Sequence, residues 1–263
     1  MNYLYPKEIL VKKLVYVFLL QVLLQGHQTA DYVLPVYVFD HLHYKGTHHF
    51  GFPKTGAYRT KFLIESVEDL RKTLQSRGSN LMIFQGRPKE AVANILKNLN
   101  GSALTLICQA EVTKEETDVE NCLQKISREN KANFIKIWGS TLYHKSDIPF
   151  PIKNVPDNYT SFRKEVEFKC SIRPEISMPK TLKPLPNCEL TLGELPSYQL
   201  LNSEKPQPAP SSAFPFQGGE TSALQRLKSY LWETDAVAQY KQTRNGLLGK
   251  NHRPLIFSHN SIS

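Results

Sequence analysis

The sequence predicts an α/β protein with a parallel, Rossmann-like sheet flanked by helices. Between residues 33 and about 145, short apolar runs alternate with segments whose apolar residues recur at helical spacing. Such alternation is typical of βαβ units, whose right-handed crossovers place helices on both faces of one sheet. We expect an α/β domain over residues 1–150, an extended linker over 151–217, and the first helices of an incomplete all-α domain over 218–263.

Four apolar runs are the expected strands. Val33–Phe39 is apolar along its whole length, as in a strand buried on both faces, and Pro35 is tolerated near its start. The other expected strands are residues 80–85, 104–108 and 133–138.

The N-terminal apolar run, Leu14–Leu24, imitates a secretory signal because Lys12 and Lys13 precede it. It is too short to cross a bilayer, and Gln21 interrupts it. No small-residue cleavage site follows clearly. We therefore predict a buried element of an intracellular protein that has no membrane segment.

Three helices are expected between these strands. The first places one apolar stripe toward the sheet, and the second begins at Pro88, a residue suited to a first helical position. Thr113 and Glu116 are spaced as a capping box at the start of the third. The inner stripes are Leu63, Val67, Leu70 and Leu74; Val92, Ile95, Leu96 and Leu99; and Val119, Cys122, Leu123 and Ile126.

Ligands of such sheets bind beyond the carboxyl ends of the strands, which makes residues 40–57, 85–88, 109–114 and 138–150 the expected rim of a site. Glu111 lies on this rim after the third of these strands, and Glu115 and Glu116 follow it in the first turn of the next helix. One interpretation is structural, since acidic residues stabilise the first turn of a helix and Glu116 completes the capping box. The other is an acceptor for a heterocycle with N–H donors, such as a pterin. Glu111 suits that role best because capping does not already occupy it.

Several other functions have little support. The chain carries no P-loop, no GxGxxG after a strand, no GxSxG and no HExxH. The net charge of +9 favours polyanions such as nucleic acid, but the basic residues form no dense run. Four cysteines lack the spacing of a zinc site. The loop histidines His41, His43, His48 and His49 read as a solvated loop rather than a metal cluster.

The C-terminal part combines aromatic and basic residues. Nine of the 17 prolines fall between residues 174 and 217, as in an extended and irregular linker. After it, Leu224, Leu227 and Leu231 begin an amphipathic helix. Tyr240 could stack on a base or a flavin, and Arg244 could pair with a phosphate; ordinary packing and solvated surface are the competing interpretations.

A larger set of short sequence motifs resembles those of DASH-class cryptochromes, which are relatives of the DNA photolyases. The motifs occur across most of residues 22–250, in the order expected for that family. They include Phe39-Asp-x-x-x-Tyr44, Phe50-x-Phe-Pro-Lys-Thr-Gly56, Phe62-Leu-x-Glu-Ser-Val-x-Asp-Leu-Arg71, Glu111-Val-x-x-Glu-Glu-x-Asp-Val-Glu120, Trp138-Gly-x-x-Leu-Tyr143, Tyr159-x-x-Phe-Arg-Lys164, Phe214-Pro-Phe-Gln-Gly-Gly-Glu220 and Tyr240-Lys-Gln-Thr-Arg-Asn-Gly246.

The resemblance implies a blue-light flavoprotein: an α/β domain with a 5,10-methenyltetrahydrofolate antenna, and a helical domain that binds FAD. The family includes deoxyribodipyrimidine photolyases, and the DASH class repairs pyrimidine dimers preferentially in single-stranded DNA. By resemblance, Glu111 is the acidic antenna ligand, with Glu115 and Glu116 next. Tyr240 is an aromatic residue that opens the flavin pocket, and Arg244 is a basic residue that faces DNA.

Two departures from the family pattern change the expected function. The family begins with a strand that Met1–Gln21 does not resemble, so residues 14–20 must substitute for it or the sheet is incomplete. After Gly249 the flavin-phosphate segment is replaced by an unrelated sequence. We therefore expect a chain truncated at both ends that does not hold FAD stably. The alternatives are a nucleotide- or folate-binding α/β module without photochemistry, and an inactive interaction fragment.

Overall fold

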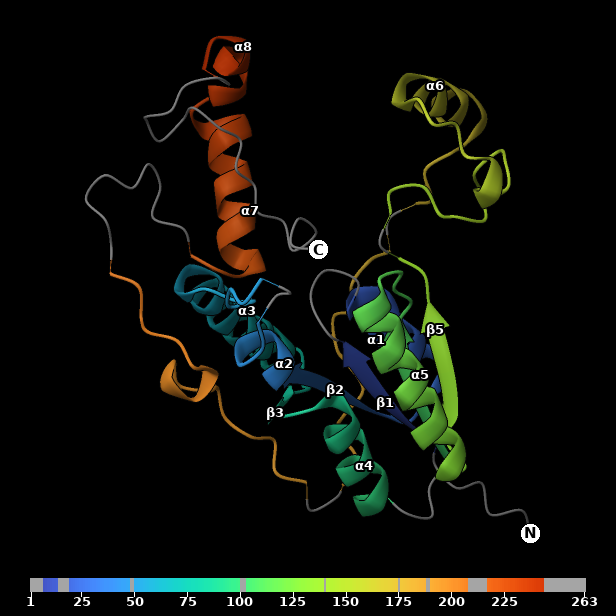
Figure 1. Ribbon diagram of the computed structural model, residues 1–263, viewed down its shortest axis with the longest axis vertical. Helices are drawn as coiled ribbons and strands as arrows, with labels where there is room; N and C mark the ends of the chain where they lie inside the picture. The colour runs from blue at the N-terminus through green and yellow to red at the C-terminus, as the bar shows by residue number, and fades with distance from the viewer. Residues whose placement is uncertain are drawn as a thin grey trace.

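The computed structural model describes residues 7–13, 19–47, 50–99, 103–139, 141–174, 176–187, 190–207 and 217–243. Its centre is a five-stranded, fully parallel sheet in the order β3-β2-β1-β4-β5 (Figure 1). The strands are β1 Lys7–Lys13, β2 Tyr32–Phe39, β3 Met82–Gln85, β4 Ala103–Gln109 and β5 Asn133–Ile137. The predicted sheet is therefore confirmed.

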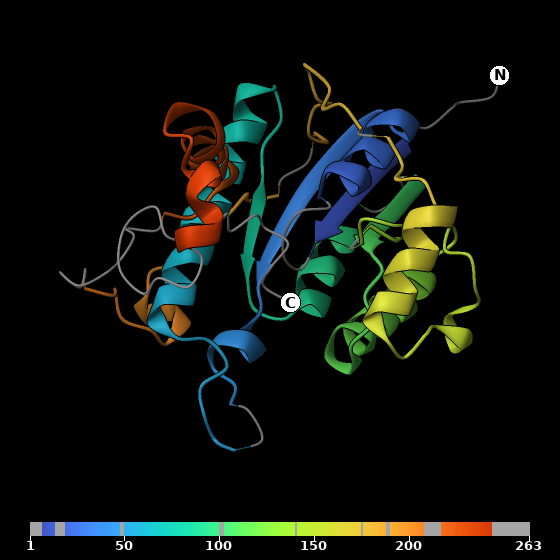
Figure 2. The ribbon, with the colours of Figure 1, turned by 90° about the horizontal axis from the view of Figure 1, so that it is seen from above.

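Helices cover both faces of this sheet (Figure 2). Those associated with the sheet are α1 Leu19–Thr29, α2 His41–Tyr44, α3 Ala57–Ser76, α4 Pro88–Asn98 and α5 Lys114–Glu129. Pro88 occupies the first turn of α4 as predicted, and the Glu90 carboxylate accepts a hydrogen bond from the Arg87 backbone N–H at 2.9 Å. None of the described helices is both long and apolar enough to cross a membrane.

The prediction for the first strand was wrong. We expected either that residues 14–20 replace it or that the sheet is incomplete, yet β1 is Lys7–Lys13 and lies in the middle of the sheet, between β2 and β4. Residues 14–18 lie outside the described residues. The apolar run Ile9–Val11 is short and flanked by charged residues, which hid it beside the longer run that follows. Leucines at 19, 20, 23 and 24 have helical spacing, and they belong to α1.

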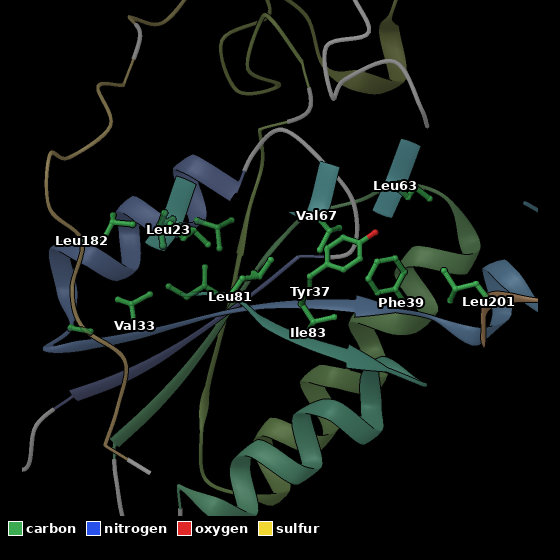
Figure 3. Close-up of a cluster of buried hydrophobic side chains, with 14 of the residues drawn as sticks. Leu23, Val33, Tyr37, Phe39, Leu63, Val67, Leu81, Ile83, Leu182 and Leu201 are labelled. Atoms are coloured by element: carbon green, nitrogen blue, oxygen red, sulfur yellow. The ribbon is translucent and has the colours of Figure 1, made fainter. Parts of the chain in front are cut away.

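The alternation of β2 builds two cores. Val33, Tyr37 and Phe39 face a cluster with α1 and α3, and Figure 3 shows Tyr37 and Phe39 beneath Leu63 and Val67 of α3. The residues between them face α4 and α5; they are Leu34, Val36 and Val38. Full burial of each such side chain stabilises the fold by about 1.5–3 kcal/mol, so β2 anchors both layers at once.

Within the region predicted as a linker, residues 176–187 and 190–207 are irregular apart from one short turn, and they pack closely on the sheet. Leu182 and Leu201 are buried in the core under α1 and α3, from opposite ends of the segment (Figure 3). The Ile83 N–H donates to the Leu192 carbonyl at 2.7 Å, so the segment covers the free edge of β3. Gly193 has φ +69°, and a Cβ there would lie 2.1 Å from the Ile83 carbonyl oxygen. A side chain at residue 193 would push the segment off this edge.

Two helical segments project beyond the sheet at the same end of the molecule (Figure 1). One is α6, Tyr159–Lys169, which lies inside the region predicted as a linker. The other runs from α7, Glu220–Lys228, through a π-helical turn, Ser229–Glu233, and a 3₁₀ turn, Ala236–Gln239, to α8, Tyr240–Thr243. Short 3₁₀ turns also occur at Ile152–Asn154 and Gln199–Leu201.

The Gly218-Gly219 pair explains how α7 joins the sheet domain. The Gly218 N–H donates to the Glu65 carboxylate at 2.8 Å, and the Thr221 N–H donates to the Asp69 carboxylate at 3.1 Å. Both acceptors are on α3, so α3 supplies the N-cap that Gly219 cannot provide. A Cβ on Gly218 would lie 2.3 Å from the Phe62 carbonyl oxygen. Only glycine permits this close approach.

Candidate functional site

The strand order places a switch point beside β1. The chain proceeds outward from β1 to β2 and β3, and then returns to the other side of β1 to form β4 and β5. In open parallel sheets the ligand crevice lies outside the carboxyl ends of the strands at this point. Here these ends are Lys13 of β1 and Gln109 of β4, so the rim carboxylates after β4 lie where a ligand is expected.

A buried carboxylate that the sequence analysis missed organises this rim. Glu120 of α5 is 5% exposed, accepts the Glu111 backbone N–H at 2.6 Å, and pairs with Lys136 Nζ of β5 at 3.0 Å. It thus fixes the turn after β4 to α5 and to the neighbouring strand. The available signal was its spacing, because Glu120, Leu123 and Ser127 recur at helical intervals on the buried face of α5.

The expected capping box at the start of α5 is wrong. Thr113 is the N-cap residue, but its side chain makes no capping hydrogen bond. The hydroxyl of Thr117 donates back to the Thr113 carbonyl at 2.8 Å instead. Glu116 is therefore not held by the capping interaction that we predicted. Its Oε2 atom is buried and has no hydrogen-bond partner among the described residues.

The other two predicted carboxylates differ from Glu116. Glu115 is largely exposed and pairs with Lys54 Nζ at 2.5 Å, an ion pair that ties the loop after β2 to the first turn of α5. Glu111 is half-buried, and its backbone N–H is held by Glu120. The structure thus brings all three predicted residues to one rim. The buried acceptor oxygen belongs to Glu116, whereas the sequence analysis favoured Glu111 as the acceptor.

The loop after β2 forms the opposite side of this rim. Asp40 is buried, accepts the Leu42 N–H at 2.9 Å, and lies 3.5 Å from Arg87 Nε after β3. Burial lowers the pKa of His43, and the nearby carboxylates of Asp40 and Glu115 only partly oppose that effect. His43 is therefore half-buried beside these charges and is not solvated as we predicted.

No group of His, Cys, Asp and Glu side chains within the described part of the chain has the arrangement of a metal site. The loop containing His41 and His43 is partly helical, because both residues belong to α2. His48 and His49 lie outside the described residues. The described part of this loop therefore contributes charged and hydrogen-bonding side chains to the rim.

Of the two remaining predicted site residues, Tyr240 is described, and it does not join this rim. Tyr240 begins α8, is exposed, and lies with α7 on the far side of the molecule from α5 (Figures 1 and 2). Arg244 lies outside the described residues. The acidic rim and the aromatic C-terminal segment are thus separate candidate regions.

Comparisons with known proteins identify the family of this chain. A sequence profile described as DNA photolyase matches residues 21–187. Cryptochrome DASH from Xenopus laevis is 49% identical over 234 residues, which are 88% of this chain and 44% of the relative. Its counterpart from Arabidopsis thaliana, named as chloroplastic/mitochondrial, is 41% identical over 88% of this chain and 40% of the relative. The chain thus spans less than half the length of these relatives.

Solved structures agree with this relation. A cryptochrome from Synechocystis sp. PCC6803 superposes with a TM-score of 0.84 at 34% identity, over 97% of this chain and 52% of that one. An archaeal photolyase from Sulfolobus tokodaii, solved with two FAD molecules, shares the fold at a TM-score of 0.60 and 22% identity, over 84% of this chain and 46% of that one. The chain therefore belongs to the DNA photolyase family, in its cryptochrome DASH group.

Proposed function

We propose that this chain provides the antenna-binding α/β part of a photolyase-like flavoprotein, with 5,10-methenyltetrahydrofolate as the antenna. The observation that carries this proposal is the buried Glu116 Oε2 atom, which has no hydrogen-bond partner among the described residues. A pterin ring presents N–H donors, and an unpaired buried acceptor costs about 1–3 kcal/mol unless a donor reaches it. The N–H donors of a pterin therefore match the hydrogen-bonding need of the Glu116 oxygen.

Each rim carboxylate has a distinct part in the proposed site. Glu116 would accept from the pterin, Glu111 would lie beside it, and Glu115 would keep the loop after β2 in place through Lys54. Glu120 positions Glu111 by holding its backbone N–H. When bound, the folate would supply light absorption in the near ultraviolet; the residues of this chain bind and orient it.

Folate binding should depend on Glu116 more than on Glu115. Charge-assisted hydrogen bonds contribute about 1.5–3 kcal/mol, so Glu116→Gln should weaken folate binding by roughly 10- to 150-fold. The measurement is titration of the purified chain, followed by the near-ultraviolet absorption band and by thermal melting. Glu115→Gln is the comparison variant and should weaken folate binding less, since that carboxylate is exposed and acts only through its ion pair with Lys54. Equal folate affinity in Glu116→Gln and the unaltered chain would reject the site.

Flavin and DNA belong to the proposal at the level of the family, whose members bind FAD. Within residues 217–243, Tyr230 and Ala236 are the buried side chains larger than glycine, whereas drug-sized ligands lose most of their surface on binding. We propose that these residues do not hold FAD by themselves. Copurification of the chain with one equivalent of a yellow chromophore would contradict this. Photorepair of single-stranded DNA, with Arg244 facing the DNA, remains a prediction for an assembly that includes a flavin domain.

A further inference from the structure

The two outer edges of the sheet differ in what covers them. At the β3 edge, the Ile83 N–H donates to the Leu192 carbonyl at 2.7 Å, and the Arg71 side chain holds the same segment by donating to the Gly193 carbonyl at 2.5 Å. β5 forms the opposite edge and pairs with β4 (Figure 1). Within the described part of the chain, no backbone group hydrogen-bonds to the outer side of β5. Such an edge presents N–H and C=O groups on which another strand can pair.

The outward backbone groups of β5 belong to Phe134 and Lys136. The Ile137 carbonyl accepts the Ala110 N–H at 2.8 Å, so the backbone groups of Ile137 face β4. Hydrogen-bonding direction alternates along a strand, which turns the backbone groups of the residues at 134 and 136 outward. The register with β4 continues without a bulge along all five residues of β5, and β5 contains no proline. Bulges and prolines are common means of protecting an edge, and this edge has neither.

The side chains of β5 are compatible with a second strand beside it. Ile135, in the middle of β5, is 39% exposed. Its neighbours are partly buried, because Phe134 packs against the core with α4 and α5, and Ile137 packs against the core with α1 and α3. The charged residue of the strand, Lys136, pairs with the buried Glu120 carboxylate at 3.0 Å. Its charge is thus neutralised within the chain, and an apolar residue is left at the centre of the edge.

A second copy of this chain is the partner that fits the edge best. A pairing strand must itself have a free edge, and β5 has one, whereas the β3 edge is occupied by the segment around Leu192. Pairing of β5 with β3 of another copy would build an open-ended filament, and that segment blocks it. Pairing of β5 with β5 about a two-fold axis closes after two copies. The uneven protection of the two edges therefore favours a dimer over a filament.

We propose that β5 is a dimerisation edge, at which two copies of this chain pair their β5 strands antiparallel about Ile135. In this register Phe134 of each copy exchanges two hydrogen bonds with Lys136 of the other, and those are the outward-facing residues. Ile135 lies opposite Ile135 of the second copy, as a non-hydrogen-bonded pair whose side chains are close together. No like charges face each other across the axis, because each Lys136 lies opposite a phenylalanine.

The mass in solution tests this dimer. Sedimentation velocity of the unaltered chain, from micromolar to millimolar concentration, should show a monomer–dimer equilibrium. Ile135→Glu places two carboxylates opposite each other and should raise the dissociation constant of the dimer roughly tenfold or more. Leu200→Glu is the matched control, since Leu200 is 55% exposed on the turn Gln199–Leu201 and makes the same change of charge outside β5. Thermal melting should show that both variants are folded.

A cross-link tests the register and does not require a tight dimer. Cα atoms of a non-hydrogen-bonded antiparallel pair lie about 4.5 Å apart, which falls within the separation of about 4.4–6.8 Å that a disulfide spans. Ile135→Cys should therefore form a disulfide-linked dimer on mild oxidation. Val155→Cys is the control, because Val155 is also 39% exposed and lies outside β5. The unaltered chain, with four cysteines of its own, gives the background.

Three results would overturn the inference. The first is a chain that stays monomeric and cross-links no better through Ile135→Cys than through Val155→Cys. The second is a dimer that Ile135→Glu leaves as stable as before, and the third is growth into open-ended oligomers. The inference goes beyond the proposed function and does not depend on a chromophore. Glu116→Gln should dimerise like the unaltered chain, so loss of folate binding and loss of the dimer are separate outcomes.

Discussion

The α/β part and the projecting helices are stabilised by different kinds of interaction. In the first, β2 buries residues on both faces, and two clusters form around it from α1 and α3 and from α4 and α5. In the second, α6 and α7 together bury one side chain. Hydrogen bonds and glycine contacts at Gly218 and Gly219 hold α7 to α3, and the ion pair of Arg173 with Asp147 closes the base of the α6 segment. The difference shows that one region supplies its own core, while the other is held at its base and buries little of its own described surface.

The largest expected effect is the difference in stability between removing a buried leucine from the sheet and removing an exposed leucine from α7. Leu106→Ala removes a fully buried side chain of β4 and should lower the free energy of unfolding by about 2–5 kcal/mol, because a cavity is left in the core. Leu224→Ala removes an exposed leucine of α7 and should change it by less than about 0.5 kcal/mol. Urea denaturation measures both. Equal costs would mean that α7 is as deeply packed as the sheet.

The next effect tests the close approach of α7 to α3. Gly219 has φ +110°, and a Cβ there would lie 2.7 Å from Cβ of Asp69. Gly219→Ala should therefore cost about 1–3 kcal/mol and increase hydrogen exchange along α7. Gly51→Ala has a comparable positive φ of +81° but meets open space, so it isolates the backbone contribution. If the two variants cost the same, the contact with Asp69 contributes nothing.

A smaller effect is expected from the cap that α3 provides to α7. Asp69→Asn keeps the shape but removes the charge that faces the Thr221 N–H and the positive end of the helix, at a cost of about 0.5–1 kcal/mol. The exchange rate of the Thr221 amide reports it. Glu68→Gln, which alters an exposed pair with Lys72 on the same helix, should leave that amide unchanged. Faster exchange in both variants would indicate a general loss of α3 stability.

The smallest effect is a pH dependence within the α/β part. Burial lowers the pKa of His43 in the folded chain below its ordinary value of 6.5, while Asp40 and Glu115 raise it and Lys54 and Arg59 lower it. The unfolded chain therefore takes up the proton more readily, so stability is present above pH 6.5 and is lost as the pH falls toward the folded pKa.

His43→Gln should flatten this slope in urea denaturation between pH 5 and 8. His144→Gln, a change after β5, should leave the His43 contribution in place. A slope that persists unchanged in His43→Gln would assign the pH dependence to other groups.

The sequence predicted the region with its own core far better than the region without one. Continuous apolar runs such as Val33–Phe39 and helical stripes such as that of α3 are local consequences of burial on two faces, and the structure confirms them. The first strand was misplaced because the apolar run Ile9–Val11 is short. The leucines of the irregular segment 176–207 gave no periodic signal, yet Leu182 and Leu201 are buried.

The edge of the sheet at which the three carboxylates lie could be predicted, but their contacts could not. Crossover handedness and strand order place Glu111, Glu115 and Glu116 at one rim, and those features follow from the alternation of elements. The hydrogen bonds and ion pairs of each carboxylate depend on side chains that are 16 to 61 residues apart in the sequence. Examples are Lys136 with Glu120 and Lys54 with Glu115. No local pattern records such pairings.

The sequence by itself therefore determined the layers, the parallel sheet, the family and the edge at which a ligand is expected, because apolar periodicity and recurrent motifs are properties of neighbouring residues. The tertiary structure alone decided that Glu120 is buried, that one oxygen of Glu116 lacks a hydrogen-bond partner among the described residues, and that Gly218 and Gly219 meet α3. These features arise where distant segments come within hydrogen-bonding or van der Waals distance, and only the folded chain sets those distances.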